Sequence, residues 1–236
     1  MRSERRENNI RRGLWLVAVL CLLLTVWTHP VAATGGSTPI IYQGQNREKT
    51  IALTFDDGPH PIYTPQILDI LAEYDVPATF FVIGENVEQY PALLEREILE
   101  GHEIGNHTYS HIHVKGANVE QISGEIDRTE RLLYEKSGYS TTLFRPPEGV
   151  CNDTVRSVAK EMNYQLVLWS IDTRDWIPSS KESIVDTVLR EIGAGDIILM
   201  HDYIVRNSNT PDALREIIPA LLDKGYTFVT VSELIG

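Results

Sequence analysis

Cysteine is nearly absent from this chain of 236 residues, which contains 2. Cys21 lies within an apolar segment near the N-terminus, so Cys151 has no intramolecular disulfide partner in the rest of the chain. A reactive thiol is one interpretation of Cys151, but no cysteine–histidine arrangement surrounds it. A small packing residue is favoured instead. A fold built on disulfides is therefore excluded.

Positive charge is also scarce, because 21 Lys and Arg stand against 33 Asp and Glu, a formal net charge of −12. Five arginines and two glutamates lie in residues 1–33, which leaves about −15 for the rest of the chain. A surface this acidic repels nucleic acid and anionic lipid. We therefore expect no nucleic-acid partner and disfavour polyanionic substrates, whereas a neutral polymer is compatible with the charge.

A long apolar run lies near the N-terminus, from Leu14 to Trp27. It follows five arginines and precedes Ala32 and Ala33, an order typical of an export signal. Its length falls short of the roughly 20 residues that a membrane span needs. A buried core helix is disfavoured because no polar face interrupts the run. We predict residues 1–33 to be a signal peptide or an N-terminal membrane anchor, and the protein to be exported: extracellular, in the cell wall, or membrane-anchored and facing outside.

The rest of the chain divides into a linker and one domain. Residues 34–48 are predicted to be a linker, because Gly, Ser, Thr and Gln dominate there without periodicity. Residues 49–236 alternate apolar strands and amphipathic helices in about seven units without internal repeats. Strands are expected at Thr50–Phe55, Ala78–Ile83, Glu103–His107, Thr142–Arg145, Gln165–Ile171, Asp196–Met200 and Tyr226–Val231, and helices at Thr64–Tyr74, Val87–Leu99, Val119–Lys136, Val155–Met162, Ser183–Ile192 and Pro211–Asp223. Such alternation favours an α/β fold with a parallel sheet, closed or open.

Polar side chains follow the apolar strands at the points where the strands end. In closed parallel barrels the chemistry gathers at the C-terminal ends of the strands. The residues in these positions are Asp56, Asp57, His107, Arg145, Asp172 and His201. This shared placement predicts one site, independently of any motif.

Two of these segments contain possible metal ligands. His107 and His111 are four residues apart and suit one metal if the turn between them is helical or tightly curled. Asp56 and Asp57 are adjacent carboxylates, which on a regular strand would point to opposite faces. The Gly58-Pro59 break after them lets both reach one site, although a turn with two solvated aspartates is an alternative.

Asp57, His107 and His111 together form a set of two histidines and one carboxylate. Such a set leaves open positions for water and substrate, as metal-assisted hydrolysis requires. It also suits non-haem Fe(II) oxygenases, so the ligands alone do not decide the reaction. Asp56 remains free as a general base.

Three further segments that follow apolar strands contain a candidate proton donor, a candidate aromatic surface for a sugar ring, and a cation. His201 ends one such strand and is either a functional or a structural histidine. An acid in the Asp172–Trp176 segment would hold His201 protonated, while Trp176 offers a flat wall for a sugar ring, or is simply an edge aromatic. Arg145 begins a rigid turn that presents a cation and fixed backbone N–H groups.

Five segments in this order resemble the signature of the NodB-homology polysaccharide deacetylases, the family 4 carbohydrate esterases. They are TFDDG at 54–58, HTYSH at 107–111, RPPEG at 145–149, DTRDW at 172–176 and LMH at 199–201. The resemblance covers roughly Lys49 to Gly236 and implies a distorted (β/α)7 barrel. It also implies a divalent metal, most commonly Zn²⁺, bound by Asp57, His107 and His111.

The resemblance further implies the catalytic roles. Asp56 is the base that deprotonates the attacking water, and Arg145 holds Asp56 in place. His201 is the acid that protonates the leaving amine, with Asp175 setting its proton affinity. The metal and a backbone N–H of the 145–149 turn stabilise the oxyanion. The substrate groove is implied to include Pro147, Glu148, Trp176 and Leu199.

One residue departs from the family pattern. The family usually has Tyr after the second Pro, where this chain has Glu148. A carboxylate there would compete for the metal or repel developing negative charge. We expect activity to survive with an altered substrate range, and Glu148→Tyr tests this: a large rate gain would show that Glu148 handicaps catalysis.

The predicted reaction is hydrolysis of N-acetyl groups on N-acetylglucosamine or N-acetylmuramic acid of peptidoglycan, or on chitin oligomers. O-deacetylation of a xylan-type glycan uses the same machinery and stays open. A catalytically silent glycan-binding module is disfavoured because every catalytic position holds a competent residue. An Fe(II) oxygenase is disfavoured by Asp56 and His201 as base and acid. The sequence makes no prediction of the oligomeric state.

Overall fold

The computed structural model describes residues 38–45, 48–203 and 207–236. The predicted signal or anchor, residues 1–33, lies outside these ranges. Part of the predicted linker is described, and Ile40–Ile41 within it form the strand β1, which pairs with a strand of the domain. The expected boundary at residue 49 stays a prediction, but the chain already contacts the sheet nine residues earlier.

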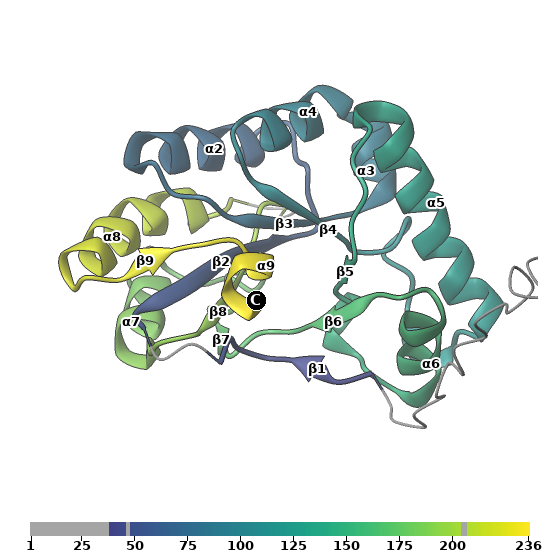
Figure 1. Ribbon diagram of the computed structural model, residues 1–236. Helices are drawn as coiled ribbons and strands as arrows, with labels where there is room; N and C mark the ends of the chain where they lie inside the picture. The colour runs from purple at the N-terminus through teal and green to yellow at the C-terminus, as the bar shows by residue number, and fades with distance from the viewer. Residues whose placement is uncertain (1–37, 46–47, 204–206) are drawn as a thin grey trace, which may run out of the picture. The chain divides into compact units, whose positions relative to one another are not determined.

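The strands form one parallel sheet that curls into a partial barrel, so the expected α/β fold is confirmed (Figure 1). Its order is β1-β6-β5-β4-β3-β2-β8-β7, with β9 also paired to β2. The strands after β1 are β2 (Thr50–Asp56), β3 (Thr79–Val82), β4 (Glu103–Asn106), β5 (Leu143–Phe144), β6 (Gln165–Val167), β7 (Ile171–Asp172), β8 (Ile197–His201) and β9 (Thr227–Phe228).

The two edges of the sheet are joined by irregular chain rather than by a regular ladder. Gln43 makes an isolated antiparallel bridge with Asp196, and the Gly44 N–H donates to the Gly195 carbonyl at 2.8 Å. The expected single strand Gln165–Ile171 is two strands, because β6 pairs with β5 and β1 whereas β7 pairs with β8. The three residues between them, 168–170, cross from one edge of the opening to the other.

Alternation along β2 separates an outer core from the barrel interior. Leu53 and Phe55 point outward into the largest apolar cluster, whereas Ala52 belongs to a smaller cluster inside the barrel. Because side chains alternate along a strand, Thr54 and Asp56 share the inner face with Ala52. The interior is therefore apolar near the start of β2 and polar at its end.

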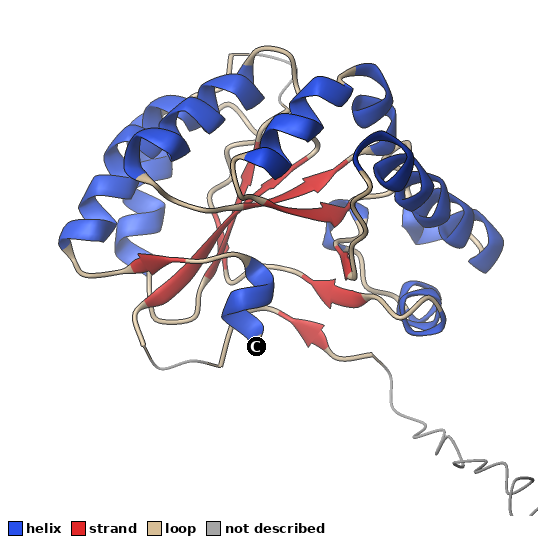
Figure 2. Cartoon of the chain, turned by 45° about the horizontal axis from the view of Figure 1, so that its top comes forward, coloured by secondary structure: helices blue, strands red, loops and turns tan. Residues whose placement is uncertain are grey.

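Amphipathic helices cover the outer face of the sheet (Figure 2). They are α2 (Tyr63–Tyr74), α3 (Gly84–Gln89), α4 (Pro91–Leu99), α5 (Val119–Ser137), α6 (Asp153–Glu161), α7 (Lys181–Glu191) and α8 (Thr210–Asp223). The short helix α9 (Val231–Ile235) and the 3-10 turns at Val114–Gly116 and Pro147–Gly149 complete the helical elements of the described residues. The expected helix Val87–Leu99 is divided into α3 and α4 at Tyr90, because Pro91 begins the second helix and lacks the N–H that would continue the first.

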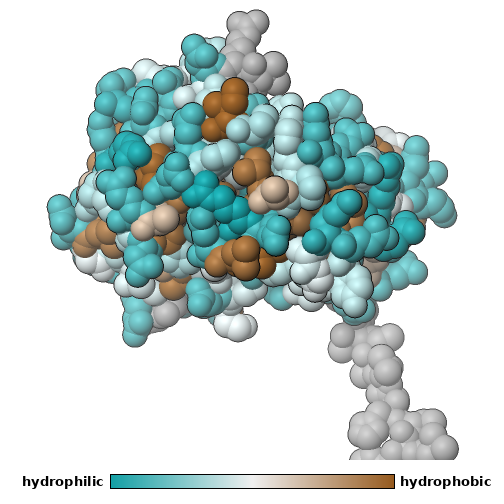
Figure 3. All heavy atoms as spheres, turned by 90° about the horizontal axis from the view of Figure 1, so that it is seen from above, coloured by the Kyte–Doolittle hydropathy of each residue, from teal (hydrophilic) through white to brown (hydrophobic). Residues whose placement is uncertain are grey.

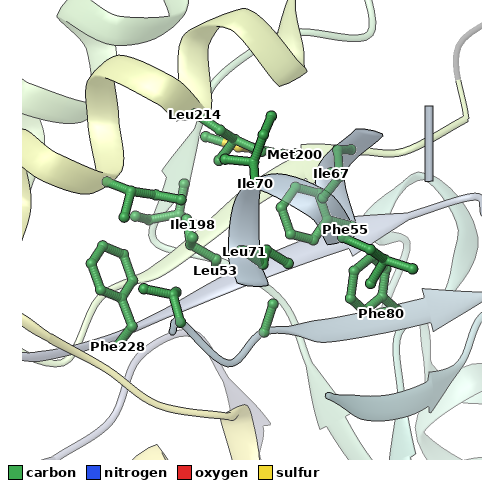
Figure 4. Packing of buried hydrophobic residues seen from close by; sticks show 14 of the residues in the cluster. Leu53, Phe55, Ile67, Ile70, Leu71, Phe80, Ile198, Met200, Leu214 and Phe228 are labelled. Atoms are coloured by element: carbon green, nitrogen blue, oxygen red, sulfur yellow. The ribbon is translucent and has the colours of Figure 1, made fainter. Parts of the chain in front are cut away.

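The outer core lies between these helices and β2, β3 and β8 (Figure 4). Phe55 and Phe80 stack across neighbouring strands with ring centroids 5.0 Å apart. Ile67 and Leu71 of α2 are fully buried against this layer. Burial of each such side chain contributes about 1.5–3 kcal/mol, so this layer fixes where the strand ends lie.

Helix α9 closes the barrel at the end where the strands begin. The sequence predicts a strand up to Val231, but the strand stops at Phe228 and a capping box at Thr230 and Glu233 starts a helix. The Val231 N–H donates to Thr79 Oγ1 at the first residue of β3. Leu234 is buried inside the barrel. The opposite end, where the strands finish, remains open for a site.

Within the described ranges, none of the helices combines the length and the apolar character that crossing a membrane requires. Hydrophobic residues on the face shown in Figure 3 are dispersed among hydrophilic ones.

Candidate metal centre and active site

A cavity of about 370 Å³ opens at the C-terminal ends of the strands. This is where the sequence predicts the polar residues to converge. Its lining consists of Asp56, Asp57, His107, His111, Glu148, Gly149, Trp169, Asp172, Trp176, Leu199 and His201.

The end of β2 places two adjacent carboxylates on the same side. Asp56 follows the strand alternation into the barrel, and Asp57 then takes a left-handed conformation with φ 75°. Asn86 Nδ2 holds this turn by donating to the Asp57 carbonyl at 2.6 Å. A Cβ on Gly58 would lie 2.0 Å from Asp202 Oδ2, so only glycine fits there. The chain breaks at Gly58-Pro59 after Asp57, and both Asp56 and Asp57 line the one cavity, as the sequence predicts.

The segment 107–111 is a tight curl rather than a helix. Thr108 and His111 have φ of 69° and 53°, conformations that cost on the order of 1 kcal/mol each outside glycine. Glu125 of α5 offsets this cost, because its Oε2 accepts the N–H groups of Tyr109 at 3.0 Å and Ser110 at 2.7 Å. The curl turns both imidazoles toward β2.

Asp57, His107 and His111 come together as the predicted three-residue set. His107 Nε2 lies 3.3 Å and His111 Nε2 3.4 Å from Asp57 Oδ1. His107 Nδ1 donates to the Arg145 carbonyl at 2.7 Å, which leaves its Nε2 unprotonated in the neutral ring and aimed at the set.

The set fits a divalent metal ion. Asp57 Oδ1 is buried and makes no hydrogen bond within the described residues, although it faces two imidazole nitrogens. Burial favours the neutral acid, but the imidazole of His107, with His201 and His111, lowers the pKa of Asp57 below its usual value. An ionised, unsatisfied carboxylate beside two nitrogen donors is the arrangement that a bound cation satisfies.

Asp56 lies beside this set but is held by a different partner. Arg145 Nη1 donates to Asp56 Oδ1 at 2.6 Å and to Thr54 Oγ1 at 2.8 Å. The wholly buried guanidinium also donates to the carbonyls of Val167 and Leu168, at 3.2 and 3.0 Å. The other carboxylate oxygen of Asp56, Oδ2, is 3.9 Å from His107 Nε2. Asp56 is thus fixed at one oxygen and open toward the cavity at the other.

His201 stands at the end of β8 and is paired with Asp175. His201 Nδ1 donates to Asp175 Oδ1 at 2.8 Å, while Asp175 Oδ2 accepts the His201 N–H at 2.8 Å and the Thr210 hydroxyl at 2.7 Å. Burial opposes the charged imidazole, but this bond and the charges of Asp175, Asp56 and Asp57 raise the pKa of His201 to about 9. The ring is therefore protonated at neutral pH.

The remaining predicted groove residues are distributed around the opening. Leu199 is buried on the wall, Trp176 is 55% exposed, and Glu148 lines the mouth. Pro147 is buried and does not line the cavity. Trp169 was not among the predicted site residues. The sequence feature that identifies Trp169 is the alternation of inward and outward side chains, which continues past the end of β6 and places this ring in the barrel interior.

Sequence reasoning also missed three buried titratable groups outside the cavity lining. Burial and the nearby Asp202 raise the pKa of Glu97 well above its usual range. Burial, partly opposed by Thr64, raises the pKa of Asp202 to about 7, and burial lowers that of His102 to about 4. The burial of Glu97 could have been predicted from the sequence, because it follows Leu94 by three positions and so shares the apolar face of its helix.

A three-ligand cation site flanked by a carboxylate and a protonated imidazole, at the open end of a curled parallel sheet, defines a metal-dependent hydrolase. The polysaccharide deacetylase model matches residues 43–167. The chain is 46% identical over 198 residues to a peptidoglycan-N-acetylglucosamine deacetylase of Bacillus cereus, covering 83% of this chain and 92% of that protein. This chain belongs to the polysaccharide deacetylase family.

Solved structures agree with this membership. A crystal structure of a peptidoglycan N-acetylglucosamine deacetylase superposes with a TM-score of 0.80 at 38% identity, covering 84% of this chain and 93% of that one. A family 4 acetyl xylan esterase from Clostridium thermocellum, in complex with a cobalt ion, has a TM-score of 0.73 at 36% identity, covering 78% and 89%.

Proposed function

We propose that this protein hydrolyses the N-acetyl groups of N-acetylglucosamine units in peptidoglycan, releasing acetate and leaving a free amine on the sugar. The observation that carries this proposal is the placement of Asp56 and His201 on the wall of one cavity with the Asp57, His107 and His111 set. The 46% identity to a peptidoglycan-N-acetylglucosamine deacetylase supports the substrate.

We infer that the metal is Zn²⁺, bound by Asp57, His107 and His111. Two imidazole nitrogens and one carboxylate are a preferred zinc ligand set with open positions. The cobalt ion in the related acetyl xylan esterase supports a divalent cation in this family. Such a cation, when bound, polarises the acetyl carbonyl and lowers the pKa of a bound water.

Asp56 would take the proton from the attacking water through Oδ2. Arg145 occupies the other oxygen at 2.6 Å, which orients the carboxylate. The water oxygen then attacks the acetyl carbon, and a positioned base of this kind contributes roughly 100- to 10,000-fold in rate.

His201 would deliver a proton to the sugar nitrogen as the carbon–nitrogen bond breaks. Burial lowers the pKa of His201, but the hydrogen bond to Asp175 raises it to about 9. The ring is therefore protonated at neutral pH. Asp56 has gained one proton and His201 has lost one, so a proton exchange with solvent restores both. The amine leaves as the sugar substituent, and acetate is released.

The walls of the cavity suit a sugar ring with a small acyl group. Leu199, buried on the inner face of β8, gives an apolar contact for the acetyl methyl. Trp176, half exposed at the mouth, offers its ring face to a pyranose. A backbone N–H of the 145–149 turn would stabilise the oxyanion, and such a donor is worth about 2.7–4 kcal/mol.

O-deacetylation of an acetylated xylan is the second candidate. The similarity to a family 4 acetyl xylan esterase favours it, because base, acid and metal ligands serve an ester as well as an amide. A silent binding module is disfavoured, since the cavity walls carry both the Asp56 carboxylate and the protonated His201 imidazole.

We propose that the protein acts outside the cytoplasm, on the cell wall. Its N-terminal sequence, with arginines before an apolar run, supports export. Retention by this segment as a membrane anchor is compatible with a cell-wall substrate.

The purified protein should be assayed for acetate release with added Zn²⁺ on peptidoglycan, chitin oligomers and acetylated xylan. We expect release from peptidoglycan, with fewer turnovers on chitin oligomers. Release from acetylated xylan alone would show that the protein hydrolyses acetyl esters rather than acetamides. Absence of release from all three substrates would reject the deacetylase function.

A further inference from the structure

Glu148 is fixed at the mouth of the cavity by its own backbone and by a neighbour. It has φ 57°, and the following Gly149 has φ 66°. A Cβ on Gly149 would lie 2.7 Å from Trp169, so the turn cannot relax toward that ring. His113 Nδ1 donates to Glu148 Oε1 at 2.8 Å. The backbone therefore determines where the Glu148 side chain leaves the turn, while its pair with His113 lies in solvent, with the His113 and Glu148 side chains 85% and 51% exposed.

The fixed charges around the cavity are unevenly distributed. Four carboxylates and the protonated His201 line it, and neither lysine nor arginine does so among the described residues. Asp56 is neutralised by Arg145, and Asp57 faces the metal position. Asp172 accepts the Arg174 N–H at 2.9 Å within its own turn, so it adds to the negative charge near Glu148. Glu148 lies outside that position and has only the His113 ring as its polar partner in the described part of the chain. The rim that an approaching sugar meets is therefore negative.

We propose that Glu148, positioned by His113, is a specificity-determining residue. It selects among acetylated sugar units by the charge of the substituents that they carry. It disfavours units with an anionic substituent, such as the lactyl carboxylate of N-acetylmuramic acid, relative to neutral or amine-bearing ones. This proposal rests on the deacetylase function.

The expected size follows from the geometry. Two like charges several ångströms apart at a partly exposed surface, with an effective dielectric between that of protein and water, alter an equilibrium by about threefold to tenfold. Salt at about 1 M shortens the screening length to about 3 Å and removes most of the effect. Discrimination at the rim is therefore moderate and salt-dependent.

The test uses one muramic acid-containing oligosaccharide in two forms, with its lactyl carboxylate free or converted to the neutral amide. The readout is the ratio of kcat/KM for the neutral form to that for the anionic form. We expect wild type to prefer the neutral form by about threefold to tenfold at low salt. In Glu148→Gln this ratio falls to near 1, and 1 M salt produces the same loss in wild type.

Glu161→Gln is the matched control. It makes the same change in net charge at an exposed position at the end of α6, just before β6 begins and so at the opposite end of the barrel. Its ratio should equal that of wild type. An unchanged ratio in Glu148→Gln, or an equal fall in Glu161→Gln, overturns the proposal. If wild type releases acetate from neither form, and also from none of peptidoglycan, chitin oligomers and acetylated xylan, the deacetylase function itself is rejected.

His113 is tested as a positioning residue. His113→Ala should lower the neutral-to-anionic ratio part of the way toward that of Glu148→Gln, through KM rather than kcat. His113→Gln, which keeps a side-chain N–H donor, should restore much of it. A purely structural role would reduce kcat for both forms equally and leave the ratio unchanged, and that result would remove His113 from the proposal.

Discussion

The floor and the rim of the cavity are built in different ways. We define the floor as Asp56, His107, Arg145, Asp175 and His201. Four of these are no more than 6% exposed, and each is tied to another by a hydrogen bond. We define the rim as Glu148 and Trp176, whose side chains are about half exposed. The Glu148–His113 contact is exposed to solvent, whereas the Asp56–Arg145 contact is buried.

This difference predicts that residues of the floor and of the rim affect different properties of the protein. Charges interact strongly where water is excluded and weakly where it is not. Changes in the floor should therefore alter kcat, proton affinity or folding by large factors. Changes at the rim should alter the choice of substrate by small ones.

Replacing the base should have the largest effect. Asp56→Asn keeps the shape and the contact with Arg145 but removes the proton acceptor. We expect kcat to fall roughly 100- to 10,000-fold. Acetate release under saturating substrate measures this, with Zn²⁺ held constant. Near-wild-type turnover in Asp56→Asn would show that another group is the base.

Removing the buried cation tests whether the floor is also a folding element. Arg145→Met leaves Asp56 buried without its partner, which costs about 3–5 kcal/mol for a broken buried pair. Urea denaturation measures the free energy of unfolding. The control Arg131→Met removes an exposed pair with Asp127 and should change it by less than about 0.5 kcal/mol. Equal losses in the two variants would refute the contrast between floor and surface.

The acid side of the floor predicts a pH effect. Burial lowers the pKa of His201, but Asp175 and the other nearby carboxylates raise it to about 9. Without the Asp175 charge the pKa falls, so His201 loses its proton at lower pH. In Asp175→Asn the alkaline limb of kcat/KM should move to lower pH. A limb that stays in place would separate His201 from the acid role.

A pH-dependent effect on stability is expected at Glu97, outside the floor and the rim. Burial and Asp202 raise its pKa, so the folded protein holds a proton that the unfolded chain releases. Stability from this group is full below its ordinary pKa of about 4.5 and declines as pH rises toward the raised value, by at most about 1.4 kcal/mol per pH unit. Glu97→Gln should therefore gain in Tm over wild type as pH rises from 5 to 8.

The exposed neighbour Glu95 supplies the control for this prediction. In Glu95→Gln the difference in Tm from wild type should not change with pH. If Glu97→Gln also shows a constant difference, the carboxyl is not held protonated by burial.

The sequence predicts the strand ends well and the inner connections poorly. Asp56, Asp57, His107 and His201 follow apolar strands, and parallel topology brings such positions to one end. Periodicity contains no information on where β6 stops and β7 begins, because that break depends on which edge strands pair. The short helix α9 was likewise missed, since its five residues give too little periodicity to detect.

The site shows the same limit. The five motifs located the metal set, but Glu125 was missed because its role is to accept the backbone N–H groups of the 107–111 curl. Nothing in the spacing of a long charged helix marks one glutamate for that contact. Asp202 was missed for a similar reason, because its burial depends on how Gly58 packs against it.

The most direct measurement determines bound Zn²⁺ and acetate release together, in wild type, Asp56→Asn and His107→Ala, after removal of metal with a chelator and its return. If the three-residue set holds the metal and Asp56 acts beside it, wild type binds one Zn²⁺ and regains release. Asp56→Asn then binds one Zn²⁺ without release, and His107→Ala loses both. Full release by the chelated wild type, or an unchanged zinc content in His107→Ala, would contradict the metal-dependent site.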